Sequence, residues 1–132
     1  MARFYGIDEA NERLAEVRPL LEELRGERAA VAEAQRELER DRGGNGSAEK
    51  AEQLAGHEAR IRQIVRSMEQ RVRQLDEWGI ALRDISTGLI DFPALANGRP
   101  IWLCWRLGED DIGWWHEADA GLDSRQPLTE LT

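Results

Sequence analysis

The sequence Ile101-Trp102-Leu103-Cys104-Trp105-Arg106-Leu107-Gly108-Glu109, followed by Asp110-Asp111-Ile112-Gly113-Trp114-Trp115-His116-Glu117, decides how the C-terminal part of this 132-residue chain folds. It contains four of the five tryptophans, the single cysteine and one of the two histidines. Both halves alternate with the period of two that is typical of a pleated strand, and the Gly and Asp residues between them favour a tight reversal. The stretch therefore predicts a β-hairpin, whose register decides how Cys104 and His116 lie relative to each other.

Two long helical patterns precede this hairpin. Residues 8–41 carry one apolar stripe at spacings of three, four and seven, and residues 47–78 carry apolar residues at strict sevens. Pro19 lies inside the first stripe and removes one backbone donor, but the stripe continues in phase beyond it, so we expect a kink near Pro19. The glycine-rich residues 43–46 predict the reversal, with Ser47 as the N-cap of the second helix. Matching lengths and a short loop predict an antiparallel helical hairpin.

The charged edges of the helices, and the apolar residues that lie outside the seam between them, predict what this hairpin contacts. An acidic edge of the first helix is expected to lie beside a basic face of the second: Glu12, Glu16, Glu23 and Glu27 against Arg62, Arg66 and Arg73. Exposed pairs of this kind contribute only some tenths of a kcal/mol each, so they select register more than they create stability. Two helices bury a single seam, so the outer apolar positions require a further surface, and we expect a homodimer with a four-helix arrangement.

The residues between the helices and the Trp-rich hairpin predict further strands. Alternation in residues 80–83 and 89–93 indicates two short strands joined by a turn at residues 84–88. Pro93 is expected to close the second strand, because proline donates no hydrogen bond to a ladder. Residues 96–99 predict the next turn.

These elements define the predicted fold class and domain organisation. The tail from residue 118 to residue 132 shows no periodicity and is expected to be irregular. The fold is predicted to be α+β: a helical hairpin over residues 1–79, then a three- or four-stranded antiparallel β-meander with its tail over residues 80–132. We expect the two parts to pack as one domain.

Composition excludes several classes of function. The net charge is −8, and residues 84–132 carry 9 Asp or Glu against 3 Lys or Arg, so the Trp-rich part repels phosphate backbones. A basic run at residues 60–73 is typical of a solvated helix face, and nucleic-acid binding is therefore disfavoured. One cysteine excludes an intrachain disulfide, and no apolar run approaches the roughly 18 residues of a membrane span or resembles a signal peptide. The sequence predicts a cytoplasmic protein that does not bind membranes.

Several short motifs resemble a known family. They are Glu9-Ala10-Asn11, Gly88-Leu89-Ile90-Asp91-Phe92-Pro93, Leu103-Cys104-Trp105 with Gly108-Glu109, and Trp115-His116-Glu117 with Gly121 and Arg125. Together they resemble the uncharacterised prokaryotic family called domain of unknown function 2203, over nearly the whole chain. The resemblance implies a small cytoplasmic bacterial or archaeal protein with a helical hairpin and a sheet, and it implies no activity.

One hypothesis from the residues is a metal site. Cys104 and His116, with a carboxylate from Glu109, Glu117, Asp119 or Asp91, suit zinc or a similar divalent ion. A related hypothesis is a Cys104–His116 nucleophile pair, with Asp91 or Glu117 orienting the imidazole. Zinc motifs have paired Cys or His ligands at short spacings, which this chain lacks, so a buried Cys104 and a hydrogen-bonded His116 remain the simpler interpretation.

A second hypothesis places function on the tryptophans. Because Trp102, Trp105, Trp114 and Trp115 cannot share one face, one face is expected to pack on the helices and the other to expose indoles, with Arg125 nearby. The sequence therefore favours a dimerising interaction or structural module that recognises a protein partner through its Trp-rich sheet. The alternative is a small metal-binding protein or metal-dependent enzyme whose site gathers Cys104, Glu109 and His116.

Overall fold

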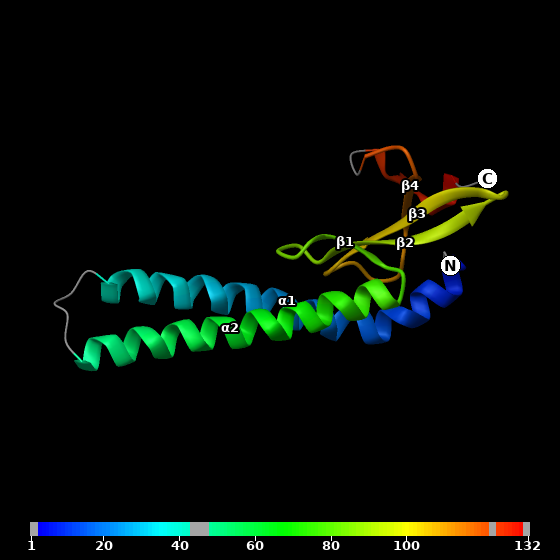
Figure 1. The fold of residues 1–132 in the computed structure, drawn as a ribbon. Helices are drawn as coiled ribbons and strands as arrows, with labels where there is room; N and C mark the ends of the chain where they lie inside the picture. Colours follow the sequence, from blue (N-terminus) through cyan, green and yellow to red (C-terminus); the bar gives the residue numbers. More distant parts are fainter. Residues whose placement is uncertain (1–2, 43–47, 122–123, 131–132) are drawn as a thin grey trace.

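A computed structural model describes residues 3–42, 48–121 and 124–130 and shows two long helices beside one sheet (Figure 1). The elements in chain order are α1 (Ile7–Arg42), α2 (Ala48–Glu77), β1 (Ala81–Asp84), β2 (Leu89–Ala96), β3 (Arg99–Arg106), β4 (Trp114–Glu117), β5 (Gln126–Pro127) and a 3-10 helix at Leu128–Glu130. The strands follow one another in the order β1-β2-β3-β4-β5, and each pair is antiparallel. The predicted α+β fold with a helical hairpin and an antiparallel meander is confirmed.

The helices pair as predicted, but through a different arginine. Arg71 donates from Nε to Glu27 at 2.8 Å and also pairs with Glu23, whereas Arg62, Arg66 and Arg73 make no such pair within the described residues. Arg71 lies one helical turn before the buried Leu75, so it borders the seam between the helices. Helix α1 runs without a break through Pro19. The predicted reversal and the Ser47 cap fall at residues 43–47, outside the described residues.

The prediction that Pro93 closes its strand is wrong. Strand β2 continues to Ala96, and Pro93 pairs with Trp102 of β3. The Pro93 carbonyl points away from β3 and accepts the backbone N–H of Tyr5 at 2.7 Å. At Pro93 the edge of β2 opposite β3 is not covered by β1, since the β1 pairing stops at Ala81 with Asp91. The absence of a backbone N–H at Pro93 therefore removes no hydrogen bond between strands.

The tail also differs from the prediction, because it adds a fifth strand. Trp114 and Trp115 pair with Pro127 and Gln126, and Leu128 donates its N–H to the carbonyl of Gly113 at 2.9 Å. A two-residue strand is too short to show a period of two, so no pattern in the sequence predicts it.

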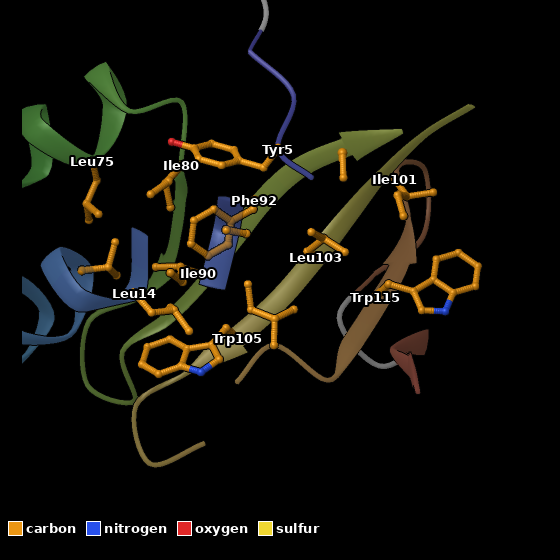
Figure 2. Packing of buried hydrophobic residues seen from close by; sticks show 14 of the residues in the cluster. Tyr5, Leu14, Leu75, Ile80, Ile90, Phe92, Ile101, Leu103, Trp105 and Trp115 are labelled. Carbon is orange, nitrogen blue, oxygen red and sulfur yellow. The ribbon is translucent and has the colours of Figure 1, made fainter. Parts of the chain in front are cut away.

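The core forms where the first half of α1 covers one face of the sheet (Figure 2). Its largest fully buried side chains come from α1, α2 and strands β2 and β3: Leu14, Leu21, Leu24, Leu75, Ile90, Phe92, Leu103 and Trp105. Leu75 is the one buried residue of α2. The first half of α1 therefore supplies most of the helical side of the core, and α2 joins it near its C-terminal end through Leu75. No helix in the described part of the chain has the length and apolar character needed to cross a membrane.

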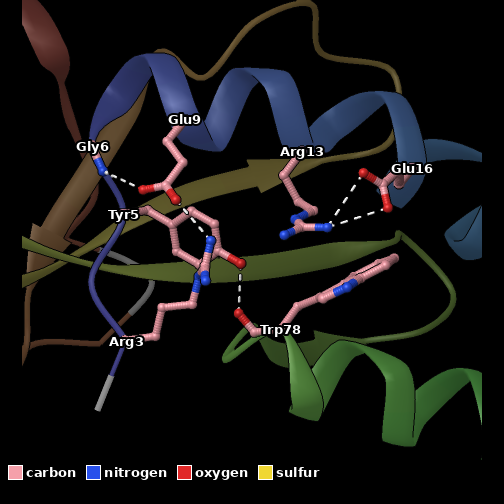
Figure 3. A network of polar contacts seen from close by, with 7 residues as sticks. All are labelled: Arg3, Tyr5, Gly6, Glu9, Arg13, Glu16 and Trp78. Carbon is pink, nitrogen blue, oxygen red and sulfur yellow. Dashed lines mark hydrogen bonds and ion pairs between the residues drawn. The ribbon is translucent and has the colours of Figure 1, made fainter. Parts of the chain in front are cut away.

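The N-terminal segment joins both helices to the sheet (Figure 3). The Tyr5 hydroxyl donates to the carbonyl of Trp78 at 2.5 Å, and its ring packs edge-on against Phe92 at 5.0 Å between centroids. Arg13 of α1 stacks over the Trp78 ring at 4.7 Å. The segment thereby fixes the end of α2 and the edge of β2 to the start of α1.

The turn between β1 and β2 is held by a single carboxylate. Asp84 accepts hydrogen bonds from the hydroxyls of Thr87 and Ser86 and from the backbone N–H of Thr87. These hydrogen bonds, that of Thr87 first, hold the pKa of Asp84 below its ordinary value. Gly88 completes the turn with φ of +66°, and a Cβ there would lie 2.5 Å from Cγ of Leu107. Only glycine fits both the backbone conformation and the space.

We expect Gly88→Ala to lower the free energy of unfolding by about 1–3 kcal/mol, because alanine is strained at positive φ and Leu107 must move. Urea unfolding followed by circular dichroism measures the change. Gly26→Ala is the matched control, since Gly26 lies in α1 with nothing within 4 Å of its Cβ position, and it should stabilise the protein by about 0.5–1 kcal/mol. Equal effects of the two substitutions contradict this explanation of the turn.

Candidate functional site

The register of β2, β3 and β4 assembles the chemically interesting side chains on the face of the sheet that points away from α1, which we call the outer face. Asp91 pairs with Cys104, Cys104 with Trp114, and Trp102 with His116. The alternate residues Phe92, Leu103, Trp105 and Trp115 belong to the core on the other face. Cys104 and His116 therefore share this face as diagonal neighbours.

The centre of the outer face is a buried Asp91–His116 pair. Nε2 of His116 lies 3.0 Å from Oδ2 of Asp91, and the contact spans β3, which runs between the strands that carry the two residues. Nε of Arg83 donates to the same oxygen at 2.9 Å. Asp91 is 0% exposed and His116 is 3% exposed. A buried carboxylate is stable only when its charge is compensated, and here one imidazole and one guanidinium compensate it.

Both ring nitrogens of His116 face oxygen acceptors. Nδ1 lies 3.0 Å from the backbone carbonyl of Glu117, and Nε2 faces Asp91. An imidazolium donates to both oxygens at once, whereas either neutral tautomer donates to one of them. Oδ1 of Asp91 is buried and has no hydrogen-bond partner within the described residues. The pair therefore holds a rotamer-locked histidine whose nitrogens are both occupied.

Cys104 lies opposite Asp91 on the same face as this pair, as a buried thiol. Burial first, and then the negative charge of Asp91, raise the pKa of the Cys104 thiol to about 11. The thiol is therefore protonated at neutral pH, and neither nitrogen of His116 is free to take its proton. The arrangement does not support the Cys104–His116 nucleophile pair.

Cys104 is expected to react slowly with an alkylating reagent in the folded protein. At pH 8 a pKa of about 11 leaves roughly 100-fold less thiolate than the ordinary value of 9.0, and burial slows the reaction further. The rate should rise with pH up to about pH 11, and the urea-unfolded chain provides the reference rate. Labelling of the folded protein at pH 7 as fast as that of the unfolded chain contradicts the raised pKa.

Two tryptophans stand over this buried centre, and each carries a stacked arginine. The guanidinium of Arg83 lies 4.9 Å from the ring centroid of Trp102, and that of Arg125 lies 4.5 Å from that of Trp114. Arg125 is fixed in turn by Glu109, whose Oε2 accepts its hydrogen bond at 2.8 Å. Trp114 is 36% exposed and Trp102 is half-buried, so both rings reach solvent. The outer face presents two rigid, amphipathic Trp–Arg pairs.

The other predicted site residues take different positions. Trp105 and Trp115 are core residues on the α1 side, and Trp105 donates its indole N–H to the carbonyl of Asp110. Glu109 is engaged by Arg125 and by the backbone N–H of Arg106, away from the Asp91–His116 pair. Among the described residues, no group of three or more His, Cys, Asp or Glu side chains is arranged to hold a metal ion. The geometry brings Cys104 and His116 together but does not add Glu109 to them.

Arg83 lies on the outer face, but none of the hypotheses from the sequence includes it. Its place on the first strand follows from the alternation of residues 80–83, but the pairing of β1 with β2 carries a register shift between Leu82 and Asp84. Alternation from Ala81, which pairs with Asp91, puts Arg83 on the same face as Asp91, but no local pattern in the sequence indicates that the two side chains pair.

Comparison with known proteins identifies a family. The family described as Uncharacterized conserved protein (DUF2203) matches residues 3–128. No curated protein and no solved structure matched the chain.

Proposed function

Because the chain belongs to the DUF2203 family, whose description names no activity, we propose its function from the geometry: a cytoplasmic interaction module that recognises a protein partner through the outer face of its sheet. The observation that carries this proposal is the pair of solvent-reaching tryptophans, Trp102 and Trp114, each held by a stacked arginine. Trp and Arg are the residues most enriched among those that dominate binding energy at protein interfaces.

Preorganisation supports the same proposal. The indoles stand on strands β3 and β4, and the guanidinium groups are fixed by Asp91 and Glu109. Side chains that are already ordered lose little conformational entropy on binding, so more of their contact energy appears as affinity. The single buried thiol fits a reducing compartment, which is why we place the protein in the cytoplasm.

Site-specific photo-crosslinking in cells tests the proposal. Leu95 is 50% exposed and lies on the outer face, because its neighbours Ala94 and Ala96 are core residues, so a photoreactive amino acid there leaves both tryptophans intact. We expect one cross-linked protein species, which is lost when Trp102→Ala and Trp114→Ala are combined. The control position is Glu22, an exposed residue of α1. Cross-linking that is equal at the two positions, or that survives the double substitution, contradicts the proposal.

The homodimer stays a prediction of the sequence, and the structure shows where to test it. Apart from Leu75, no residue of α2 is buried, and Val65 and Val72 are exposed. If two copies pair through this surface, Val65→Glu should convert a dimer into a monomer in sedimentation equilibrium. Gln63→Glu, at an exposed position of α2 that faces away from these valines, is the matched control.

A further inference from the structure

The helices extend beyond the sheet as a two-helix arm, which we define as residues 25–42 of α1 and 48–73 of α2 (Figure 1). Within the described part of this arm, Ala34 and Leu38 are the buried side chains, and both belong to α1. In the α2 half of the arm Val65 and Val72 are exposed, and Ile61 and Met68 are half-buried, so these apolar side chains can contact another molecule.

These positions form a groove along the arm. Both helices line it, its volume is about 760 Å³, and its lining is mostly apolar, with Val31, Val65, Met68 and Val72 among the lining side chains. Past Val65 the groove continues into a second hollow of about 430 Å³ that reaches Ile61. From residue 61 to residue 73 the groove is roughly 18 Å long, which matches about three turns of a helix laid along it.

The rim of the groove is strongly basic. Five arginines and a single acid, Glu69, line the two hollows; the arginines are Arg25, Arg28, Arg62, Arg66 and Arg73. None of the five has an ion pair or a hydrogen bond within residues 3–42, 48–121 and 124–130, whereas Arg36 and Arg71 on the same helices are paired with acids. Unpaired arginines around an apolar floor are unusual in a chain whose net charge is −8.

We propose that this groove docks an acidic amphipathic helix of a protein partner. The apolar floor suits a stripe at positions i, i+3, i+4 and i+7 of such a helix, and the arginines suit acids on either side of the stripe. A second copy of the same face brings arginines against arginines, so charge disfavours pairing of two identical grooves. A nucleic acid satisfies the arginines but leaves the valine and methionine floor without an apolar partner.

The test uses the whole chain and two fluorescent peptides, each about 20 residues long, that share one apolar helical stripe and differ in flanking Glu or Lys. Fluorescence anisotropy should show the Glu peptide binding at least about tenfold more tightly than the Lys peptide, with affinity falling as salt is added. Equal binding of the two peptides, or tighter binding of mixed-sequence RNA than of the Glu peptide, overturns the proposal.

Substitutions at exposed positions then locate the site. Combining Arg25→Glu with Arg73→Glu should abolish the preference for the Glu peptide, because the lining then carries three arginines and three acids, and Val72→Glu should weaken both peptides. Arg60→Glu is the matched control, because Arg60 is exposed on α2 and lies outside the groove. A dimer that Val65→Glu dissociates, and that excludes the Glu peptide, overturns the proposal in favour of a second copy. The outer-face cross-link is independent of these outcomes, because it concerns another surface.

Discussion

His116→Ala is expected to lower the free energy of unfolding by about 3–5 kcal/mol, because it leaves the buried charge of Asp91 without one of its two partners. The remaining partner, Arg83, is partly solvated and compensates the charge less well. Urea unfolding monitored by tryptophan fluorescence and circular dichroism measures the loss. The pair is thus expected to be the polar support of the outer face.

A double-mutant cycle separates the pair from its surroundings. Asp91→Ala in the His116→Ala background should cost less than Asp91→Ala alone, by about 1 kcal/mol or more, because the charge that lacks a partner is then removed. Glu117→Ala is the control, because Glu117 follows His116 on β4 and pairs at 2.9 Å with Arg99 of β3. Both of these side chains are solvent-accessible, so the loss of stability should stay near 1 kcal/mol or below. Additive effects of the two single substitutions contradict a coupled pair.

Trp105→Ala should lower stability much more than Trp114→Ala, although both residues come from the same Trp-rich stretch. Trp105 is fully buried and its indole N–H anchors the loop after β3 through Asp110, so its removal should cost about 3–5 kcal/mol of stability. Trp114 is 36% exposed under Arg125, so its removal should cost roughly 1–2 kcal/mol.

Partner binding should show the reverse order. In conditions where both variants remain folded, Trp114→Ala should abolish the cross-link from position 95, while Trp105→Ala should retain it. The comparison uses circular dichroism to confirm folding and the cross-linked yield per folded protein as the readout. Loss of the cross-link in the core variant alone contradicts the assignment of Trp114 to a recognition surface.

The helices and most of the sheet are predictable because their patterns are local. The apolar stripe of α1 continues through Pro19, and the alternation of residues 101–107 places Trp105 and Cys104 on opposite faces before any contact is known. The extension of β2 through Pro93 depends instead on Tyr5, which lies 88 positions earlier in the sequence and covers the free edge. Contacts of that range leave no local pattern.

The candidate site divides in the same way. Period-two alternation predicts that Cys104 shares a face with Trp102 and that His116 shares one with Trp114. It does not predict which carboxylate His116 meets, because Asp91 reaches it across β3, nor that Arg83 pairs with the same carboxylate. Likewise, heptad spacing predicts that α2 pairs with another helix. It does not predict that Arg71 pairs with Glu23 and Glu27, while five other arginines line a groove.

The five indole N–H signals of ¹⁵N-labelled protein, titrated with the partner that cross-links through position 95, test the recognition surface most directly. We predict that the signals of Trp102 and Trp114 shift, while those of Trp105 and Trp115, which lie in the core, keep their positions. A titration that leaves Trp102 and Trp114 unchanged, or that moves the core indoles instead, contradicts a partner-binding outer face.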